Sequence, residues 1–339
     1  MVCFCRNRAE HNLHFRRNSC KIDLYLYHLL RKEDFMSRLS YIWKSKKYRK
    51  KRNHFLILLS SVLIAAILLT ILLHSCTAKQ ETWTASAPTN EMLINDKYEG
   101  KKLIPKYDIK KNIYQDSKFS TKSGIKSYAD KNAFKGVDVS AWQGDINWKK
   151  VKKAGIDFAM IRVGYRGQVQ GSICEDTKYE QNMKGALSAG LKVGVYFYSQ
   201  AVTKSETEEE AAYVLKKIAP YKVTWPIAFD WEAKSDNETA SSGSLRTQTV
   251  TPEDASAFAK VFCEDIKAAG YQPCFYTNKN MGYTAFDLKL LEKYPMWYAE
   301  YKKLPSFYYH FDLWQYTSKG KIDGINNLVD LNISFRKFG

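Results

Sequence analysis

The chain has 339 residues, enough for one large domain or two ordinary ones, and a formal net charge of +18. About eleven of these charges lie before residue 53, so the rest of the chain is only mildly basic. Basic charge gathered at one end argues against a nucleic-acid-binding fold and favours contact with a membrane surface. The 7 cysteines are too few for a disulfide framework in a chain this long. Cys263 and Cys274 could bond to each other, but small buried side chains are the favoured interpretation.

An uncharged apolar stretch runs from Phe55 to Leu73. It is long enough to cross the ~30 Å hydrocarbon core of a bilayer. The nine residues 44–52 just before it are almost all basic, and few basic residues follow it. The positive-inside rule therefore predicts a cytoplasmic N-terminus, with the remainder of the chain on the other side of the membrane.

These patterns predict three segments ahead of any folded domain: a basic cytoplasmic tail over residues 1–53, a transmembrane helix over 54–76, and an extracytoplasmic linker over 77–133. The tail upstream of Met36 has no clear pattern, and Met36 offers an alternative start. The sequence Leu73-His-Ser-Cys76 resembles a lipoprotein cleavage site only weakly, because the His fits poorly. Residues 77–133 are polar and lack sustained periodicity, so we expect an extended stalk.

From residue 134 onward, short apolar runs alternate with helical patterns. Strand–helix units of this length predict a parallel sheet, and about eight strands in one domain over 134–339 favour closing that sheet into a barrel. A doubly wound open sheet is the competing architecture. Neither a Gly-x-Gly-x-x-Gly nor a phosphate-loop motif supports nucleotide binding. We expect strands at 136–140, 158–163, 193–198, 227–232, 273–276, 295–299, 311–316 and 328–331, and helices at 147–153, 178–189, 205–218 and 251–270.

The fourth predicted strand ends in two carboxylates, Asp230 and Glu232, spaced two residues apart. In a strand this spacing puts both on one face and Trp231 on the other. Buried acids without partners are costly. A pair of them lets one acid hold a proton near neutral pH while the other stays ionised, as cleavage of a glycosidic bond requires.

In a barrel of this kind the working residues lie at the C-terminal ends of the strands. Those ends supply four acids and a ring of aromatic side chains, which would converge on one mouth. Aromatic faces stack on sugar C–H surfaces, and acids cleave acetals. The candidate catalytic residues are Glu232, Asp230, Asp138 and Asp330, and the candidate substrate-binding residues are Trp142, Tyr196, Tyr198, Tyr276, Trp297, Trp314, Gln315 and Tyr316.

Seven short motifs in this region resemble, in their order, those of the glycoside hydrolase family 25 lysozymes. The resemblance covers about residues 134–337. Any one motif is weak, but the ordered set is highly specific. The motifs are GVDVSAWQG (136–144), FAMIRVG (158–164), GVYFY (194–198), IAFDWE (227–232), FYTN (275–278), LWQYT (313–317) and VDLN (329–332).

The resemblance implies an α/β fold, an incomplete TIM-like (β/α)5(β)3 barrel with five strand–helix units and then three strands. It also implies N-acetylmuramidase activity on peptidoglycan glycan strands. Glu232 matches the family's general acid, Asp230 its neighbouring carboxylate, and Asp138 and Asp330 the flanking acids. No cofactor or metal is expected. With the membrane segment, the expected location is the bacterial cytoplasmic membrane, with the catalytic domain outside.

Three questions stay open at this level. The first is whether hydrolysis retains or inverts the configuration at the anomeric carbon. Residues two apart in a strand, such as Asp230 and Glu232, stand ~6.5–7 Å apart between Cα atoms, which lies between the carboxylate separations expected for retention and for inversion. Asp230 could stabilise the transition state or orient the substrate's own acetamide. A non-catalytic wall-glycan-binding module would use the same aromatics but not the acids, and the substrate could be another wall polysaccharide.

Overall fold

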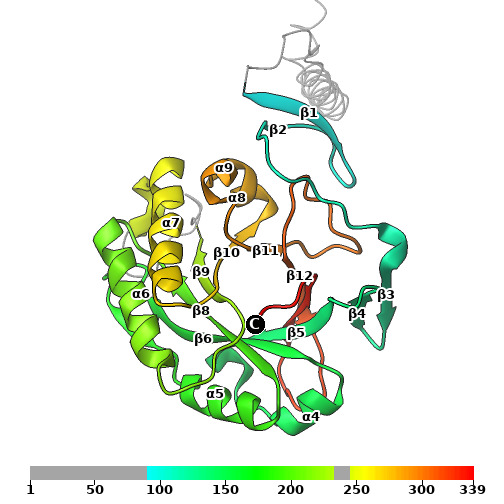
Figure 1. Ribbon diagram of the computed structural model, residues 1–339, viewed down its shortest axis with the longest axis vertical. Coiled ribbons are helices and arrows are strands. Elements are labelled where there is room, and N and C mark those ends of the chain that lie inside the picture. The colour runs from blue at the N-terminus through cyan, green and yellow to red at the C-terminus, as the bar shows by residue number, and fades with distance from the viewer. Residues whose placement is uncertain (1–89, 233–244) are drawn as a thin grey trace, which may run out of the picture. The chain divides into compact units, whose positions relative to one another are not determined.

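At the centre of the computed structural model, which describes residues 90–232 and 245–339, eight strands form a closed barrel (Figure 1). The sheet closes because β5 pairs with β6 on one side and with β13 on the other. This confirms the barrel and excludes the open sheet. The eight strands are β5 (Phe134–Val139), β6 (Phe158–Arg166), β8 (Lys192–Ser199), β9 (Ile227–Trp231), β10 (Pro273–Asn278), β11 (Met296–Ala299), β12 (Leu313–Gly320) and β13 (Val329–Ser334).

Seven barrel strands run parallel to one another, in the order β5, β6, β8, β9, β10, β11 and β12, and β13 runs antiparallel to β12 and β5. Helical segments follow each of the first five strands, whereas β11, β12 and β13 are joined by loops. The five-plus-three arrangement implied by the resemblance is therefore present. A short strand, β7, adds to the end of β6. The remaining elements of this part are β7 (Ile173–Glu175), α4 (Trp148–Lys153), α5 (Tyr179–Ser188), α6 (Lys204–Ile218), α7 (Pro252–Ala268), α8 (Lys279–Thr284), α9 (Leu288–Leu291), η3 (Ala141–Gln143) and η4 (Arg246–Thr249).

Local sequence signals fix where the helices begin. The Asn147 side chain accepts a hydrogen bond from the backbone N–H of Lys150 at the start of α4. Thr251 does the same for α7, with Pro252 at the first helical position. These side chains satisfy amide groups that have no partner inside the helix. Gly270, in the left-handed region at φ +85°, follows the end of α7, as the sequence predicted.

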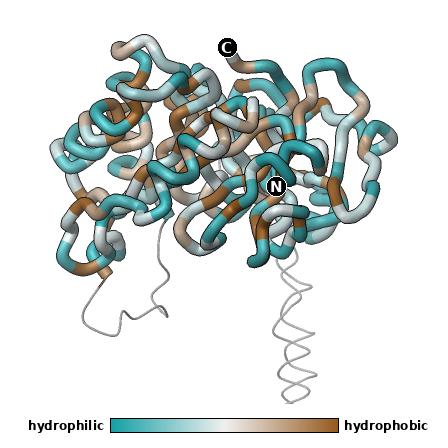
Figure 2. Tube along the Cα trace, turned by 90° about the horizontal axis from the view of Figure 1, so that it is seen from below, coloured by the Kyte–Doolittle hydropathy of each residue, from teal (hydrophilic) through white to brown (hydrophobic). Residues whose placement is uncertain are grey.

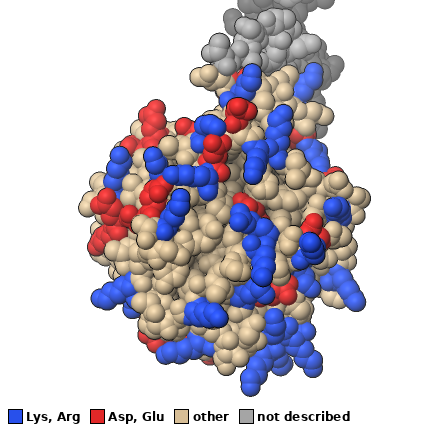
Figure 3. Space-filling model, in the orientation of Figure 1, with Lys and Arg blue, Asp and Glu red and all other residues tan. Residues whose placement is uncertain are grey.

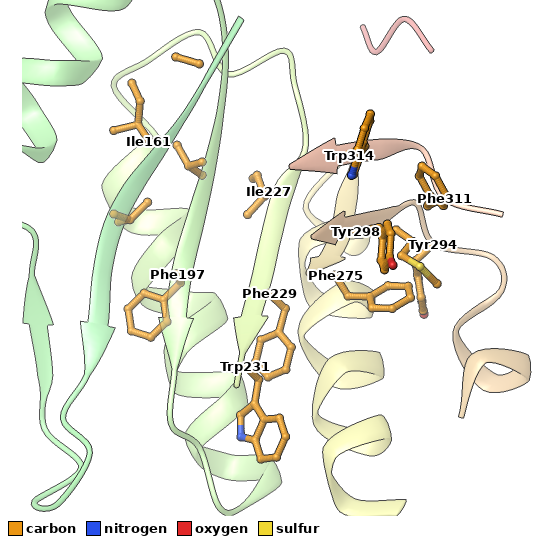
Figure 4. Close-up of a cluster of buried hydrophobic side chains, with 14 of the residues drawn as sticks. Ile161, Phe197, Ile227, Phe229, Trp231, Phe275, Tyr294, Tyr298, Phe311 and Trp314 are labelled. Carbon is orange, nitrogen blue, oxygen red and sulfur yellow. The ribbon is translucent and has the colours of Figure 1, made fainter. Parts of the chain in front are cut away.

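Apolar side chains form two layers, one inside the barrel and one between the barrel and its helices. The outer layer includes Phe229 and Trp231 of β9 (Figure 4), and Trp231 is 1% exposed. The inner layer fills the barrel below its mouth. Gly136 belongs to that wall, because a Cβ there would lie 2.2 Å from the Phe158 ring. Cys263 and Cys274, the pair considered for a disulfide, are free and buried.

The predicted linker over 77–133 is wrong for the residues that the structure describes. Residues 90–133 form two hairpins and a 3-10 turn that pack on the barrel domain. Their apolar side chains, such as Ile104, Tyr114 and Phe119, join the outer core. These anchors are irregularly spaced among lysines and serines, so they show no helical or strand period in the sequence. The elements are β1 (Glu91–Asp96), β2 (Gly100–Pro105), η2 (Asp116–Lys118), β3 (Phe119–Lys122) and β4 (Ile125–Tyr128).

A buried ion cluster ties the first hairpin to the barrel. The ammonium of Lys279, directly after β10, lies 2.8 Å from an Asp96 carboxylate oxygen and 3.0 Å from Glu300, which follows β11. The Ser306 hydroxyl donates to Asp96 and to Glu300 at 3.2 and 2.7 Å. The single positive charge of Lys279 is shared between the two acids, and the hydrogen bonds of the cluster offset part of the cost of removing three charges from water.

The rest of the segment is held by hydrogen bonds and stacked rings. The Tyr309 hydroxyl donates to the carbonyl of Pro105 at 2.5 Å and accepts from the amide of Tyr107 at 2.9 Å. The Tyr114 ring stacks on Phe335 with centroids 3.8 Å apart. These contacts reach loops and strands from the second half of the barrel. Residues 90–133 are therefore part of the folded domain.

The predicted tail (1–53), transmembrane helix (54–76) and the start of the linker (77–89) lie outside the described residues. In residues 90–232 and 245–339, no helix has the length and hydrophobicity to cross a membrane. Along this part of the trace, short hydrophobic stretches alternate with hydrophilic ones (Figure 2).

Candidate active site

Asp138 and Asp330 face each other on neighbouring strands. They are directly paired in the register of β5 and β13. Side chains of such opposite pairs stand close together on one face of the sheet. Because β13 is antiparallel, Asp330 near its start lies at the same edge as the C-terminal end of β5. Two Asp138 contacts come from the barrel interior: the side-chain amides of Asn332 and Gln315 donate to its Oδ2 at 2.7 and 3.0 Å.

The environment of this pair favours one shared proton. Burial raises the pKa of Asp138 to about 6, although the amide donors of Asn332 and Gln315 oppose the shift. Burial and then the Asp138 charge raise the pKa of Asp330 to about 8. Donors to a carboxylate stabilise its ionised form. Near neutral pH, Asp138 therefore carries the charge and Asp330 the proton.

Asp230 and Glu232 stand at the end of β9. Asp230 is 8% exposed and pairs in register with Tyr198 of β8. Glu232 is the first residue after β9, half-buried, and its backbone carbonyl accepts a hydrogen bond from Gln200 at 3.2 Å. Trp231 between them packs in the outer core and donates from its indole to the Ala201 carbonyl at 3.1 Å. The predicted alternation along this strand is confirmed.

Three tyrosines are close enough to the four acids for the acids to shift their pKa values. Burial raises the pKa of Tyr196, and the Asp138, Asp230 and Asp330 carboxylates add to it. Burial also raises the pKa of Tyr276, with contributions from Glu232, Asp230 and Asp138. Burial, Asp330, Asp138 and Glu232 raise the pKa of Tyr301. Each of the four acids thus acts on at least two of the three tyrosines, and each tyrosine is affected by three of the acids. The four carboxyl groups therefore lie in one region. Around neutral pH, all three hydroxyl groups stay protonated.

Gln315 connects the tyrosines to the Asp138 carboxylate. Its Oε1 accepts hydrogen bonds from the hydroxyl groups of Tyr276 at 3.0 Å and Tyr301 at 2.8 Å. These two bonds fix the orientation of the amide, so that its Nε2 points at Asp138. Trp297 plays the same part for Asn332, because its indole N–H donates to Oδ1 at 2.8 Å.

Three of the predicted substrate-binding aromatics are too buried for that role. Trp297 is 1% exposed and lies in the barrel interior, in edge contact with Tyr196 and Tyr276. Trp314 is 0% exposed and Tyr316 is 3% exposed, and both belong to the outer core. Alternation along β12 explains this: with Gln315 pointing inward, its two neighbours point outward. The chain segment 90–133 covers them there.

Trp142 and Tyr198 do line an open groove. The groove has a volume of about 910 Å³ and also exposes Arg162 and Tyr165. Trp142 is 77% exposed, the setting in which an aromatic face can bind a sugar. Tyr196 and Tyr276, which lie nearer the acids, are nearly buried and present only a small part of their surface.

Sequence reasoning missed Tyr301, Arg162 and Asp176. Arg162 donates to Asp176 at 2.8 Å, and Asp176 also accepts from the backbone of Ala141 at 3.0 Å, which fixes the turn that carries Trp142. A single arginine in the apolar strand 158–163 was a usable signal. Tyr301 lies in a loop beyond β11 and gave none. Among the described residues, no group of three or more His, Cys, Asp or Glu side chains could hold a metal ion.

The shared proton makes stability depend on pH. Between about pH 4 and 8 the folded pair holds more protons than the unfolded chain, about two below pH 6 and one between pH 6 and 8, so the free energy of unfolding falls as pH rises through this window. We expect Asp330→Asn to remove most of that slope and to stabilise the protein at pH 8 by about 1–2 kcal/mol. Urea unfolding at pH 5 and pH 8 measures both effects.

Asp323→Asn serves as the matched control, because this aspartate is exposed and its ion pair with Lys150 is a long one at 3.5 Å. This variant should keep the wild-type slope. If Asp330→Asn also kept it, the two aspartates would not share a proton.

Comparison with known proteins gives the same family as the motifs. The model of the glycosyl hydrolases family 25 matches residues 137–325. The autolytic lysozyme of Clostridium acetobutylicum is 26% identical over 204 residues, which cover 58% of this chain and 55% of that protein. Lysozyme M1 of Streptomyces globisporus is 27% identical over 216 residues, covering 60% of this chain and 68% of the relative. The chain thus spans little more than half of the first relative.

Solved structures share the fold. A family 25 glycosyl hydrolase from Bacillus anthracis superposes with a TM-score of 0.51 at 22% identity, covering 64% of this chain and 96% of that one. The modular autolysin LytC from Streptococcus pneumoniae gives a TM-score of 0.50 at 23% identity and covers 74% of this chain and 57% of its own. The family match spans more than half of the sequence, includes three of the four acids and ends just before Asp330. The chain belongs to the glycosyl hydrolases family 25.

Proposed function

We propose that the protein is a peptidoglycan hydrolase that cleaves the β-1,4 bond between N-acetylmuramic acid and N-acetylglucosamine. The observation that carries the proposal is the placement of four acids at one edge of a family 25 barrel: Asp138 and Asp330 are paired in register, and Asp230 and Glu232 stand at the end of β9. The two relatives reported above are both named lysozymes, which supports the same substrate. LytC, which shares the fold, has also been solved with a synthetic peptidoglycan ligand.

Glu232 is the general acid in this mechanism. Its protonated carboxyl group donates to the glycosidic oxygen as the C–O bond breaks, and positive charge develops on the sugar ring. Asp230, ionised, stabilises that charge from the neighbouring position on the same face. A water molecule then adds to the anomeric carbon and returns a proton to the Glu232 carboxylate.

Asp138 and Asp330 flank this reaction with one negative charge between them. Two amide donors hold Asp138 ionised, so its charge adds to the field that favours a cationic transition state. The proton on Asp330 keeps that carboxyl group neutral, so the two paired aspartates do not repel each other. We further propose that the domain works outside the cytoplasmic membrane, tethered by residues 54–76.

A turbidity assay on purified cell walls, paired with a binding assay on the same walls, separates an enzyme from a glycan-binding module. The proposed hydrolase clears the suspension and releases reducing ends. Binding to the walls without release of reducing ends would replace the proposal by the non-catalytic module.

Trp142→Ala is expected to raise KM for glycan strands about three- to tenfold, because one aromatic contact is worth about 0.5–1.5 kcal/mol. Stability should barely change, since the side chain is 77% exposed. Steady-state kinetics and thermal melts measure the two effects. An unchanged KM would remove Trp142 from the binding surface.

A further inference from the structure

A second groove, lined in part by Tyr301, opens between the barrel and the hairpin of β3 and β4. Its volume is about 880 Å³. The hairpin contributes its tip, Ser123 and Gly124, and Lys126 of β4. The barrel contributes the loop after β11 and the end of β12, namely Tyr301, Lys302, Lys303, Tyr316, Thr317, Ser318, Lys319, Gly320 and Lys321.

The lining of this groove is strongly basic. It holds five lysines and no aspartate or glutamate. In the described part of the chain, no carboxylate lies within ion-pair distance of Lys126, Lys302, Lys303, Lys319 or Lys321. Burial, and then the nearby Lys303 ammonium, lower the pKa of Lys126, as expected where cations gather without a counter-charge. In Figure 3, the right-hand side of the face, where β3 and β4 lie in Figure 1, carries more Lys and Arg than Asp and Glu.

The walls of the groove are held in place by a defined hairpin loop and by hydrogen bonds to the barrel. Ser123 and Gly124 both have positive φ angles, +51° and +79°, and form a two-residue hairpin loop. Lys126 fixes the hairpin to the barrel: its amide donates to the Tyr316 hydroxyl at 3.0 Å, and its ammonium to the carbonyls of Lys302 and Lys303 at 3.1 and 2.8 Å. The hairpin wall lies outside the 137–325 span of the family match.

One side chain links the groove to the acids. Tyr301 is 52% exposed and lines the groove, and its hydroxyl donates to Gln315, which in turn donates to Asp138. An anionic group bound in the groove would therefore lie beside the glycan strand that is being cleaved. In peptidoglycan, the peptide attached to each muramic acid provides such groups, because its residues carry free carboxylates.

We propose that this lysine groove binds the carboxylates of a stem peptide on the substrate strand. The proposal rests on the proposed function and adds a preference to it: the protein favours strands with anionic stems over strands whose stem carboxylates are amidated. A phosphodiester wall polymer could offer similar charge. The position of Tyr301 favours the stem peptide, since a separate polymer would gain nothing from a groove that is linked to Asp138 through Tyr301 and Gln315.

The test measures binding and cleavage separately. Fluorescence anisotropy gives the Kd of labelled glycan strands with free or amidated stem carboxylates for the catalytically disabled Glu232→Gln protein. The same measurement is made after adding Lys303→Gln with Lys319→Gln in the groove. The control pair is Lys149→Gln with Lys152→Gln on α4, two exposed lysines that lie outside both grooves.

The preference is the ratio of the Kd for amidated strands to the Kd for strands with free carboxylates. We expect Lys303→Gln with Lys319→Gln to lower this ratio about three- to tenfold, as the loss of two exposed charge contacts predicts. The preference should fade in about 0.5 M salt, and the control pair should keep it. Equal preference in the groove and control variants would overturn the proposal. The proposal would also be overturned if a free phosphodiester polymer competed for the groove while the protein showed no preference between free and amidated glycan strands. If the anionic strands bind through the groove and the wild-type protein cleaves neither strand, the proposed function fails and the groove proposal stands.

Discussion

Replacing Glu232 with Gln is expected to lower the rate of wall hydrolysis by at least about 10²-fold while the fold is kept. The amide has nearly the same shape as the carboxyl group but has no proton to give to the leaving oxygen. The half-buried side chain lies where the Asp230 strand ends, among tyrosines that sense its charge. Turbidity loss on cell walls, with circular dichroism as the check on folding, measures the effect.

Glu208→Gln on α6 is the matched control, because this glutamate is exposed and lies outside the site. It should keep the wild-type rate. Near-full activity of Glu232→Gln would remove Glu232 from the role of general acid. Loss of activity in both variants would point to a general effect of charge.

Removing residues 90–133 is expected to unfold the barrel domain. This segment covers Trp314, Phe311 and Phe335, and it provides Asp96 to the ion cluster around Lys279. Exposing one large buried side chain costs about 1.5–3 kcal/mol, so losing several approaches the whole 5–15 kcal/mol stability of a typical domain. Lys279 would lose one of its buried partners, which adds to the cost.

The comparison is between a chain that begins at residue 134 and one that begins at residue 86, where the compact unit of the domain starts. Soluble yield and the urea midpoint measure the difference. The longer chain should unfold cooperatively, and the shorter one should aggregate or bind a dye for exposed apolar surface. Equal midpoints would make the segment a separate stalk after all.

Most of the barrel was predictable from local patterns. The helix caps at Asn147 and Thr251, the glycine after α7 and the apolar runs of β6, β8 and β9 each carry a signal within a few residues. Residues 90–133 carried none, because their anchors are single tyrosines and isoleucines that find partners about 200 residues away. Long-range contacts of this kind leave no period in the sequence.

The acids of the site were predictable because strand ends in a barrel meet at one edge, and all four meet there. The aromatics were harder. Trp314 and Tyr316 flank Gln315, and a strand cannot point three successive side chains at one mouth, so the sequence prediction conflicted with its own alternation rule. Tyr301 lies two residues beyond the end of β11, so no strand pattern places it at the site. Its role becomes clear from the hydrogen bond that it donates to Gln315 in the structure.

Mass spectrometry of peptidoglycan digested by the wild-type protein tests the central claim most directly. We predict fragments that carry new muramic acid reducing ends, absent from the Glu232→Gln digest. New glucosamine reducing ends, free stem peptides with intact glycan strands, or no fragments at all would contradict the account.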